Sequence, residues 1–91
     1  MPRRRIPRPN PLGEETLSND YKAIFAHNLR VARARTGMSQ SELASKFNVK
    51  RAYIVQVESG SENLTLDTMR KFSEILGIDL LDMLRKDFER G

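Results

Sequence analysis

The chain has 91 residues, enough for one small domain, with 38% hydrophobic residues and a net charge of +4. It contains no cysteine and a single histidine, which excludes a disulfide-stapled scaffold and a cysteine- or histidine-rich metal site. No apolar run approaches the roughly 20 residues that a membrane-spanning helix needs, and the N-terminus lacks the apolar core of a secretory signal. We therefore expect a soluble cytoplasmic protein with no metal, no cofactor and no membrane partner.

The positive charge is concentrated in the first two thirds of the chain. Residues 1–13 contain four arginines and no acidic residue, and residues 20–58 contain seven basic residues against three acidic ones. Residues 59–91 contain five basic residues against seven acidic ones. This asymmetry suits a chain that meets a polyanion with one surface, although a solvated mixture of surface charges would give the same counts.

Residues 1–19 are predicted to form a flexible basic arm in front of a single domain of residues 20–91. All four prolines lie within residues 1–13, and proline disfavours a helix interior. The arm could follow DNA phosphates, enter a minor groove where arginine is favoured, or make no fixed contact. The residues concerned are Arg3, Arg4, Arg5 and Arg8.

Helix signals dominate from residue 18 onward. The expected starts combine an apolar residue, a capping residue and a second apolar residue five positions after the first, and Ser39 with Glu42 fits a capping box. Glycines stand where helices are expected to end, at Gly37, Gly60 and Gly77. These signals predict five helices, over about residues 20–36, 40–47, 51–59, 66–76 and 80–89.

Each predicted helix carries apolar residues at helical spacing, which defines the expected core. The connections between the helices are short, so the sequence predicts a compact all-α bundle. In the first four helices the core residues are Phe25, Leu29, Ala32, Leu43, Ala44, Phe47, Ile54, Val57, Met69, Phe72, Ile75 and Leu76.

The second and third predicted helices form a helix-turn-helix. Only a tight link at Asn48 separates them, and asparagine tolerates the left-handed conformation that such a turn requires. Two short helices joined this closely must cross rather than run parallel. The outer face of the second one is then free to enter a major groove.

A set of spaced residues carries a family resemblance: Leu29-Arg30, Arg33, Gly37 to Gln40, Leu43-Ala44, Tyr53-Ile54, Glu58 to Gly60, Asn63 to Leu66, Leu76 to Ile78 and Leu84. With this set, residues 26–84 resemble the Cro/repressor-type helix-turn-helix domain, also called the XRE or lambda-repressor-like family. One departure is Asn48, where the family usually has glycine. The resemblance implies a five-helix lambda-repressor-like domain that binds double-stranded DNA as a homodimer on a pseudo-palindromic site.

The resemblance also implies DNA-binding roles by position. It makes residues 51–59 the recognition helix and places Gln40, next to Ser39, on a phosphate or an adjacent base. It places Lys50, Arg51, Ala52 and Gln56 at the DNA-facing start and outer face of this helix. Helical spacing puts Ser59 on the same face, and the side chains of Tyr53 and Val55 are further candidates for DNA contact.

Side-chain chemistry leaves alternatives for several of these residues. Arg51 could bind guanine or only a phosphate, and Gln56 could bind adenine or remain solvated. Tyr53 could pack inward or place its hydroxyl on the DNA backbone. Lys50 is expected to contact a phosphate, and Ala52 or Val55 a thymine methyl group.

Two further interactions are expected. The resemblance implies a structural ion pair between Arg33 and Glu58, which by sequence alone could both be surface charges. Residues 80–89 hold more apolar residues than a small monomer needs, so some of them would form a two-fold contact, unless the helix only covers the protomer core. The candidates are Leu81, Met83, Leu84 and Phe88.

The sequence contains no catalytic constellation and no glycine-rich phosphate loop, so we do not expect an enzyme or any catalytic residue. It predicts a sequence-specific transcriptional regulator, a repressor or autoregulator. The alternative is an antitoxin or another protein-interaction module, with a partner protein and with DNA binding secondary. Such a module needs a segment that folds on its partner, and the basic, apolar-poor arm suits phosphate better.

Overall fold

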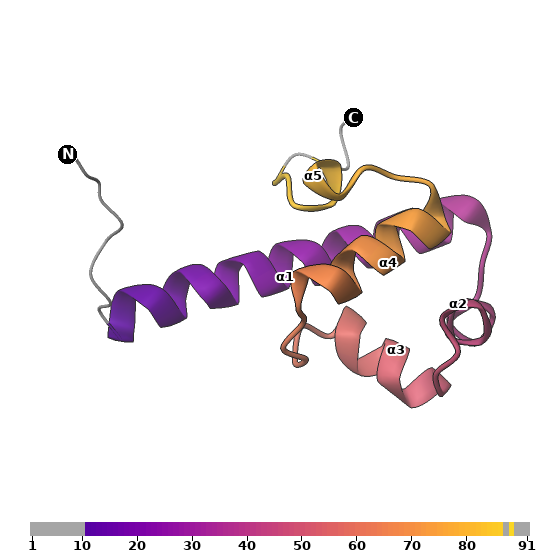
Figure 1. The fold of residues 1–91 in the computed structure, drawn as a ribbon, viewed down its shortest axis with the longest axis horizontal. Helices are drawn as coiled ribbons and strands as arrows, with labels where there is room; N and C mark the ends of the chain where they lie inside the picture. The colour runs from indigo at the N-terminus through magenta and orange to yellow at the C-terminus, as the bar shows by residue number, and fades with distance from the viewer. Residues whose placement is uncertain (1–10, 87, 89–91) are drawn as a thin grey trace.

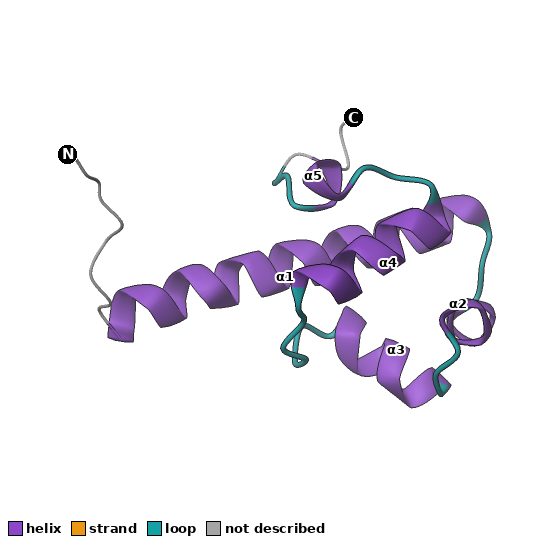
Figure 2. Cartoon of the chain, viewed as in Figure 1, coloured by secondary structure: helices purple, strands orange, loops and turns teal. Residues whose placement is uncertain are grey.

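The computed structural model describes residues 11–86 and 88, with side chains from residue 21 onward. Within that part every regular element is helical, as Figures 1 and 2 show, which confirms the all-α prediction. None of the described helices is long and apolar enough to cross a membrane. The five helices are α1 (Pro11–Thr36), α2 (Gln40–Phe47), α3 (Arg51–Glu58), α4 (Leu66–Leu76) and α5 (Leu80–Met83).

The start of α1 differs from the prediction. The helix begins at Pro11 rather than at residue 20, so residues 11–19 belong to α1 and not to an arm. Proline fits the first position of a helix because its fixed φ is helical. It lacks an N–H group, but an N–H group at this position would have no acceptor within the helix. The predicted arm contacts of Arg3, Arg4, Arg5 and Arg8 lie outside the described residues.

Local capping sets the starts of α2, α4 and α5 where the sequence predicts them. Ser39 Oγ accepts a hydrogen bond from the amide of Glu42 (3.0 Å), and Glu42 Oε1 accepts one from the amide of Ser39 (2.7 Å). The side chains of Thr65 and Asp79 cap α4 and α5 by accepting hydrogen bonds from the amides of Thr68 and Leu81. At the end of α2, Asn48 has φ 63° and ψ 45°, the left-handed conformation expected there.

The core lies between α1, α4 and the helix-turn-helix. In Figure 1, α4 runs beside the second half of α1, with α2 and α3 on one side of the pair and α5 on the other. The Phe72 ring stacks on Phe47, with ring centroids 4.1 Å apart, and contacts Phe25 at 6.2 Å. The predicted core residues of α1 to α3 are all buried, whereas Met69 and Ile75 of α4 are half-buried against the core.

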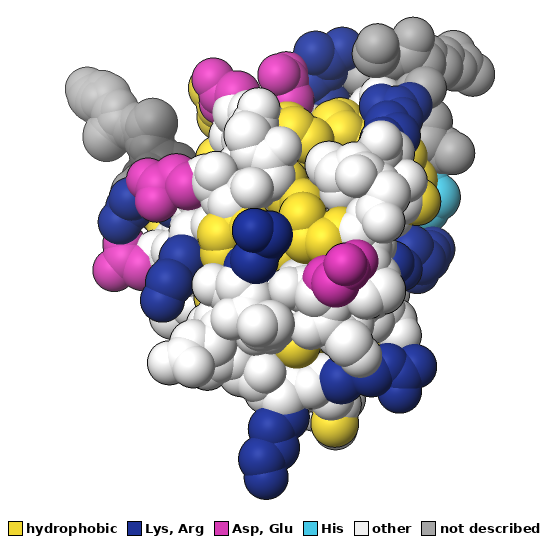
Figure 3. All heavy atoms as spheres, turned by 90° about the vertical axis from the view of Figure 1, so that its right-hand side faces the viewer, with side chains coloured by type: hydrophobic (Ala, Val, Ile, Leu, Met, Phe, Trp, Pro, Cys, Tyr) yellow, Lys and Arg dark blue, Asp and Glu magenta, His cyan; other side chains and the backbone are white. Residues whose placement is uncertain are grey.

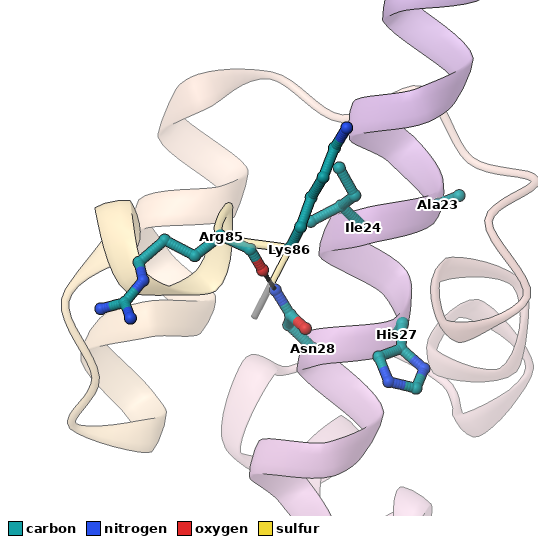
Figure 4. A pocket seen from close by; sticks show the side chains of 6 residues that line it. All are labelled: Ala23, Ile24, His27, Asn28, Arg85 and Lys86. Carbon is teal, nitrogen blue, oxygen red and sulfur yellow. Dashed lines mark hydrogen bonds between the residues drawn. The ribbon is translucent and has the colours of Figure 1, made fainter. Parts of the chain in front are cut away.

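The last helix is shorter than predicted, and a side chain of α1 binds the backbone at and just beyond its C-terminal end. The Nδ2 atom of the buried Asn28 donates hydrogen bonds to the carbonyl oxygens of Met83 (2.7 Å) and Arg85 (2.8 Å). Figure 4 shows the Asn28 side chain reaching from α1 to the backbone at Arg85. The chain leaves the helix at this point, and Phe88 returns into the core.

This geometry corrects the predicted dimer contact. Met83 is completely buried and Phe88 is 8% exposed within a single protomer, so neither offers surface to a second copy. Leu84 is half-buried, and Leu81 is 73% exposed. Of the four predicted interface residues, Leu81 alone presents most of its side chain to the outside.

Candidate nucleic-acid interface

The helix-turn-helix separates a buried face of α3 from an exposed one. Ile54 and Val57 are buried against the core, and the amide of Val49 donates to the carbonyl of Ala44 (2.9 Å) to close the turn. The opposite face of α3 is solvent-exposed. It carries five of the predicted DNA-facing residues: Arg51, Ala52, Val55, Gln56 and Ser59.

The N-terminal end of α3 is basic. Lys50 occupies the N-cap position with an extended backbone, and its side chain makes no capping hydrogen bond. The Lys50 side chain therefore does not satisfy the backbone N–H groups of the first turn of α3. Lys50 and Arg51 are both exposed here. A helix N-terminus flanked by two cations attracts an anion such as a phosphate.

Two carboxylates of the helix-turn-helix have intramolecular partners. Glu42 lies in the capping box of α2, and Glu58 is buried in an ion pair. Figure 3 shows Lys and Arg side chains over much of this face, including its lower edge, the side on which α3 lies in Figure 1, whereas the Asp and Glu side chains in this view all lie higher up. The surface around α3 therefore has the positive charge that a polyanion requires.

The ion pair expected between Arg33 and Glu58 is present and bidentate. Arg33 Nε donates to Glu58 Oε2 (2.6 Å), and Arg33 Nη2 donates to Glu58 Oε1 (3.1 Å). The Glu58 side chain is 3% exposed and the Arg33 side chain 16% exposed. Arg33 also donates to the carbonyl of Met38 (2.9 Å), so one side chain ties α1 both to α3 and to the loop before α2.

Gln40 extends this network to the exposed face. Its Nε2 atom donates to Glu58 Oε1 (3.0 Å), and its Oε1 atom accepts from Arg51 Nη2 (3.0 Å). Gln40 is half-buried at the first position of α2. The structure thus brings four predicted site residues into one chain of contacts: Arg33, Glu58, Gln40 and Arg51.

The remaining predicted residues have internal partners. Tyr53 is half-buried and its ring stacks on Phe47 (6.2 Å between centroids). Burial, and less strongly the carboxylate of Glu62, raises the pKa of Tyr53 above its ordinary value of 10.0, so its hydroxyl is protonated at neutral pH. Ser39 caps α2, and Ser59 Oγ donates to the carbonyl of Gln56 (2.8 Å).

The sequence analysis does not assign the structural roles of two residues, Asn28 and Arg30. Asn28 carries a signal that could have revealed it, since it lies on the apolar stripe between Phe25 and Leu29, where a polar side chain must find a buried partner. Arg30 donates to the carbonyl of Glu58 (2.9 Å) and so satisfies an acceptor at the end of α3. Nothing in its sequence position indicates this contact.

In the described part, no group of acidic and histidine side chains is arranged to hold a metal ion.

A second surface, away from the exposed face of α3, is an apolar groove of about 620 Å³. Three of the most exposed large hydrophobic residues line it: Tyr21 (54%), Leu66 (67%) and Leu81 (73%). The other apolar residues that line it are Phe25, Val57, Leu64, Met69 and Leu84, and two charged residues, Lys22 and Glu62, line it as well. Exposed apolar side chains grouped around one hollow are typical of a protein-contact surface.

Comparisons with known proteins agree with this geometry. The helix-turn-helix family profile matches residues 29–83. The control protein C.BamHI of Bacillus amyloliquefaciens is 33% identical over 69 residues, covering 75% of this chain and 85% of that protein. Antitoxin HipB of Escherichia coli is 34% identical over 56 residues, covering 62% of this chain and 64% of HipB. The crystal structure of a hypothetical transcription factor from Neisseria superposes with a TM-score of 0.72 at 33% identity, covering 80% of this chain and 84% of that one. The chain belongs to the XRE-type helix-turn-helix family.

Proposed function

We propose that this protein is a transcriptional regulator that binds a specific double-stranded DNA site through the exposed face of α3. The observation that carries the proposal is a short helix with one face buried in the core and a basic, polar face held outward beside a capped α2. Relatives named as control proteins and a transcription factor support it. By occupying a promoter, the protein would act as a repressor or an autoregulator.

Within this proposal, some exposed residues at α3 contact bases and others contact the DNA backbone. Arg51 binds guanine O6 and N7, and Gln56 binds adenine N6 and N7, because their planar donor and acceptor groups match those base edges. Lys50 contacts a phosphate at the helix start, where a compact cation positions the helix without reading sequence. Ala52 and Val55 are placed to contact a thymine methyl group.

We also propose a homodimer formed through the apolar groove. An isologous contact uses the same self-complementary patch on both copies, and an exposed side chain next to a hollow can provide one. Leu81 is such a side chain, since it is 73% exposed and lines the groove. A two-fold axis would place two α3 helices about 34–36 Å apart, one turn of DNA, on a pseudo-palindromic operator. The arm arginines Arg3, Arg4, Arg5 and Arg8 would add phosphate or minor-groove contacts.

The similarity to antitoxin HipB supports a second candidate function. The protein would then bind a partner protein, and DNA binding would be secondary. Selection from a random duplex library separates the two candidates. An inverted repeat bound far more tightly than a scrambled duplex supports the regulator, whereas weak binding without a motif favours the protein-partner function.

Substitution of the base-reading residues should reduce specific binding selectively. We expect Arg51→Ala or Gln56→Ala to cost about 1–3 kcal/mol of binding free energy on the selected duplex and far less on a scrambled one. Fluorescence anisotropy titration on both duplexes measures the difference. Arg70→Ala, on the exposed surface of α4, is the matched control and should change neither affinity. Equal losses on both duplexes would show that Arg51 and Gln56 do not read bases.

Substitution in the groove should dissociate the dimer. Each Leu81→Asp substitution removes at least about 1.5 kcal/mol of apolar burial, and the two-fold axis doubles the loss, so the dimer dissociation constant should rise at least about 100-fold. Sedimentation velocity measures this without DNA. Ala34→Asp, an exposed apolar residue of α1 that does not line the groove, should leave the dimer intact. A Leu81→Asp variant that sediments like the parent would place the interface elsewhere.

A further inference from the structure

The carboxylate of Glu58 determines how the side-chain amide of Gln40 is oriented. The Glu58 side chain is 3% exposed, and both of its carboxylate oxygens accept hydrogen bonds from Arg33, so it faces Gln40 as a hydrogen-bond acceptor. The half of the amide that faces it must therefore be the donor, Nε2, at 3.0 Å from Glu58 Oε1. The amide oxygen is then turned away from Glu58, toward the start of α3.

The amide oxygen of Gln40 contacts the guanidinium of Arg51, which has several hydrogen-bond donors and no acceptor. Arg51 Nη2 donates to Gln40 Oε1 at 3.0 Å. A guanidinium has five N–H groups in one plane, so one bond to Gln40 restrains that plane and leaves donors for a base edge. The reverse amide orientation would place an NH2 group against the guanidinium and leave a carbonyl oxygen against the buried carboxylate, which is unfavourable at both ends.

We propose that Gln40 is a positioning residue that holds Arg51 ready for base recognition before DNA arrives, with its amide orientation set by the buried Glu58. This inference rests on the proposed function, in which Arg51 reads a base. It differs from the sequence prediction that Gln40 itself contacts DNA, because here Gln40 acts through Arg51. An arginine on an exposed helix end otherwise loses side-chain entropy when it binds, and prior restraint reduces that loss.

The first test is made on the free protein. Relaxation of the arginine Nε–Hε groups, measured by 15N NMR without DNA, reports the mobility of each guanidinium. Arg51 should be nearly as restrained as Arg33, which is held on a buried carboxylate, and more restrained than the exposed Arg70. In Gln40→Met, which keeps the chain length but removes both amide groups, Arg51 should become as mobile as Arg70 while Arg33 does not change. An Arg51 that is as mobile as Arg70 in the unsubstituted protein would overturn the proposal.

The second test is a double-mutant cycle on the selected operator. Gln40→Met should weaken operator binding about tenfold, in the range of direct coupling between contacting residues, and should have no further effect in an Arg51→Ala background. Gln56→Met is the matched control, since this glutamine has no side-chain link to Arg51, and its loss should persist in the Arg51→Ala background. A Gln40→Met loss that persists there would mean that Gln40 contacts DNA directly, which overturns the positioning role.

The cycle also separates this inference from the proposed function. If Arg51→Ala weakens operator binding and Gln40→Met does not, base reading by Arg51 stands and the positioning role fails. If Arg51→Ala has no effect on the operator, base reading by Arg51 fails and the positioning role in recognition fails with it. The melting temperatures of the variants should match that of the parent protein, because Gln40 is only half-buried and the ion pair between Arg33 and Glu58 is retained in every variant.

Discussion

Replacing Glu58 by alanine should lower the free energy of unfolding by about 3 kcal/mol. The substitution leaves the Arg33 guanidinium in a largely buried position without its bidentate partner, and removing one partner of a buried ion pair typically costs about 3–5 kcal/mol. We expect the lower end of this range, because the Arg33 side chain retains 16% exposure. Chemical denaturation with urea measures the change directly.

Glu74→Ala is the control for this substitution. Glu74 also pairs with an arginine at 2.6 Å, yet both side chains are well exposed, and exposed pairs contribute at most about 1 kcal/mol. The two variants delete the same side chain from a helix of the same domain, so they differ mainly in burial. A Glu58→Ala variant no less stable than Glu74→Ala would mean that Arg33 can reach solvent when its partner is removed.

Asn28→Ala should lower the free energy of unfolding by about 2 kcal/mol. The amide of Asn28 donates to two carbonyl oxygens, and leaving buried acceptors without a donor costs about 1–3 kcal/mol. The loss should also release the segment that follows α5, since these two bonds hold it against α1. Urea denaturation reports the overall stability, and limited trypsin digestion at Arg85 and Lys86 reports the release.

The matched control is Asn63→Ala. The Asn63 amide oxygen accepts from Lys22 Nζ at 2.9 Å at an exposed site, and surface substitutions of this kind usually change stability by less than about 0.5 kcal/mol. Trypsin should cleave the Asn63→Ala variant no faster than the parent at Arg85 and Lys86. Equal stability of the two asparagine variants would show that water replaces the Asn28 amide.

Sequence reasoning succeeded where the cause is local. The starts of α2, α4 and α5 follow from capping side chains that bond within their own first turn, and the left-handed Asn48 follows from the length of the link. The end of α5 could not be found in this way, because its backbone is bound by Asn28, which is more than fifty residues earlier in the chain.

The same distinction explains what was found and missed at the site. The exposed residues of α3 follow from helical periodicity, which places them opposite Ile54 and Val57. The contact between Gln40 and Arg51 depends on how two helices cross and on a carboxylate at the far end of α3, so no local pattern indicates it. The start of α1 at Pro11 differs from the prediction because proline disfavours a helix interior but is favoured at the first position of a helix.

The Glu58 carboxylate receives donors from Arg33 on α1 and Gln40 on α2 while its own backbone belongs to α3. One group therefore joins three helices, and α3 has little freedom to tilt or slide relative to the rest. Under the proposed function, a protein built in this way docks as a rigid body, and any mismatch in curvature between the two partners must be absorbed by the DNA. The bendability of operator base pairs that no side chain touches then contributes to discrimination between sites.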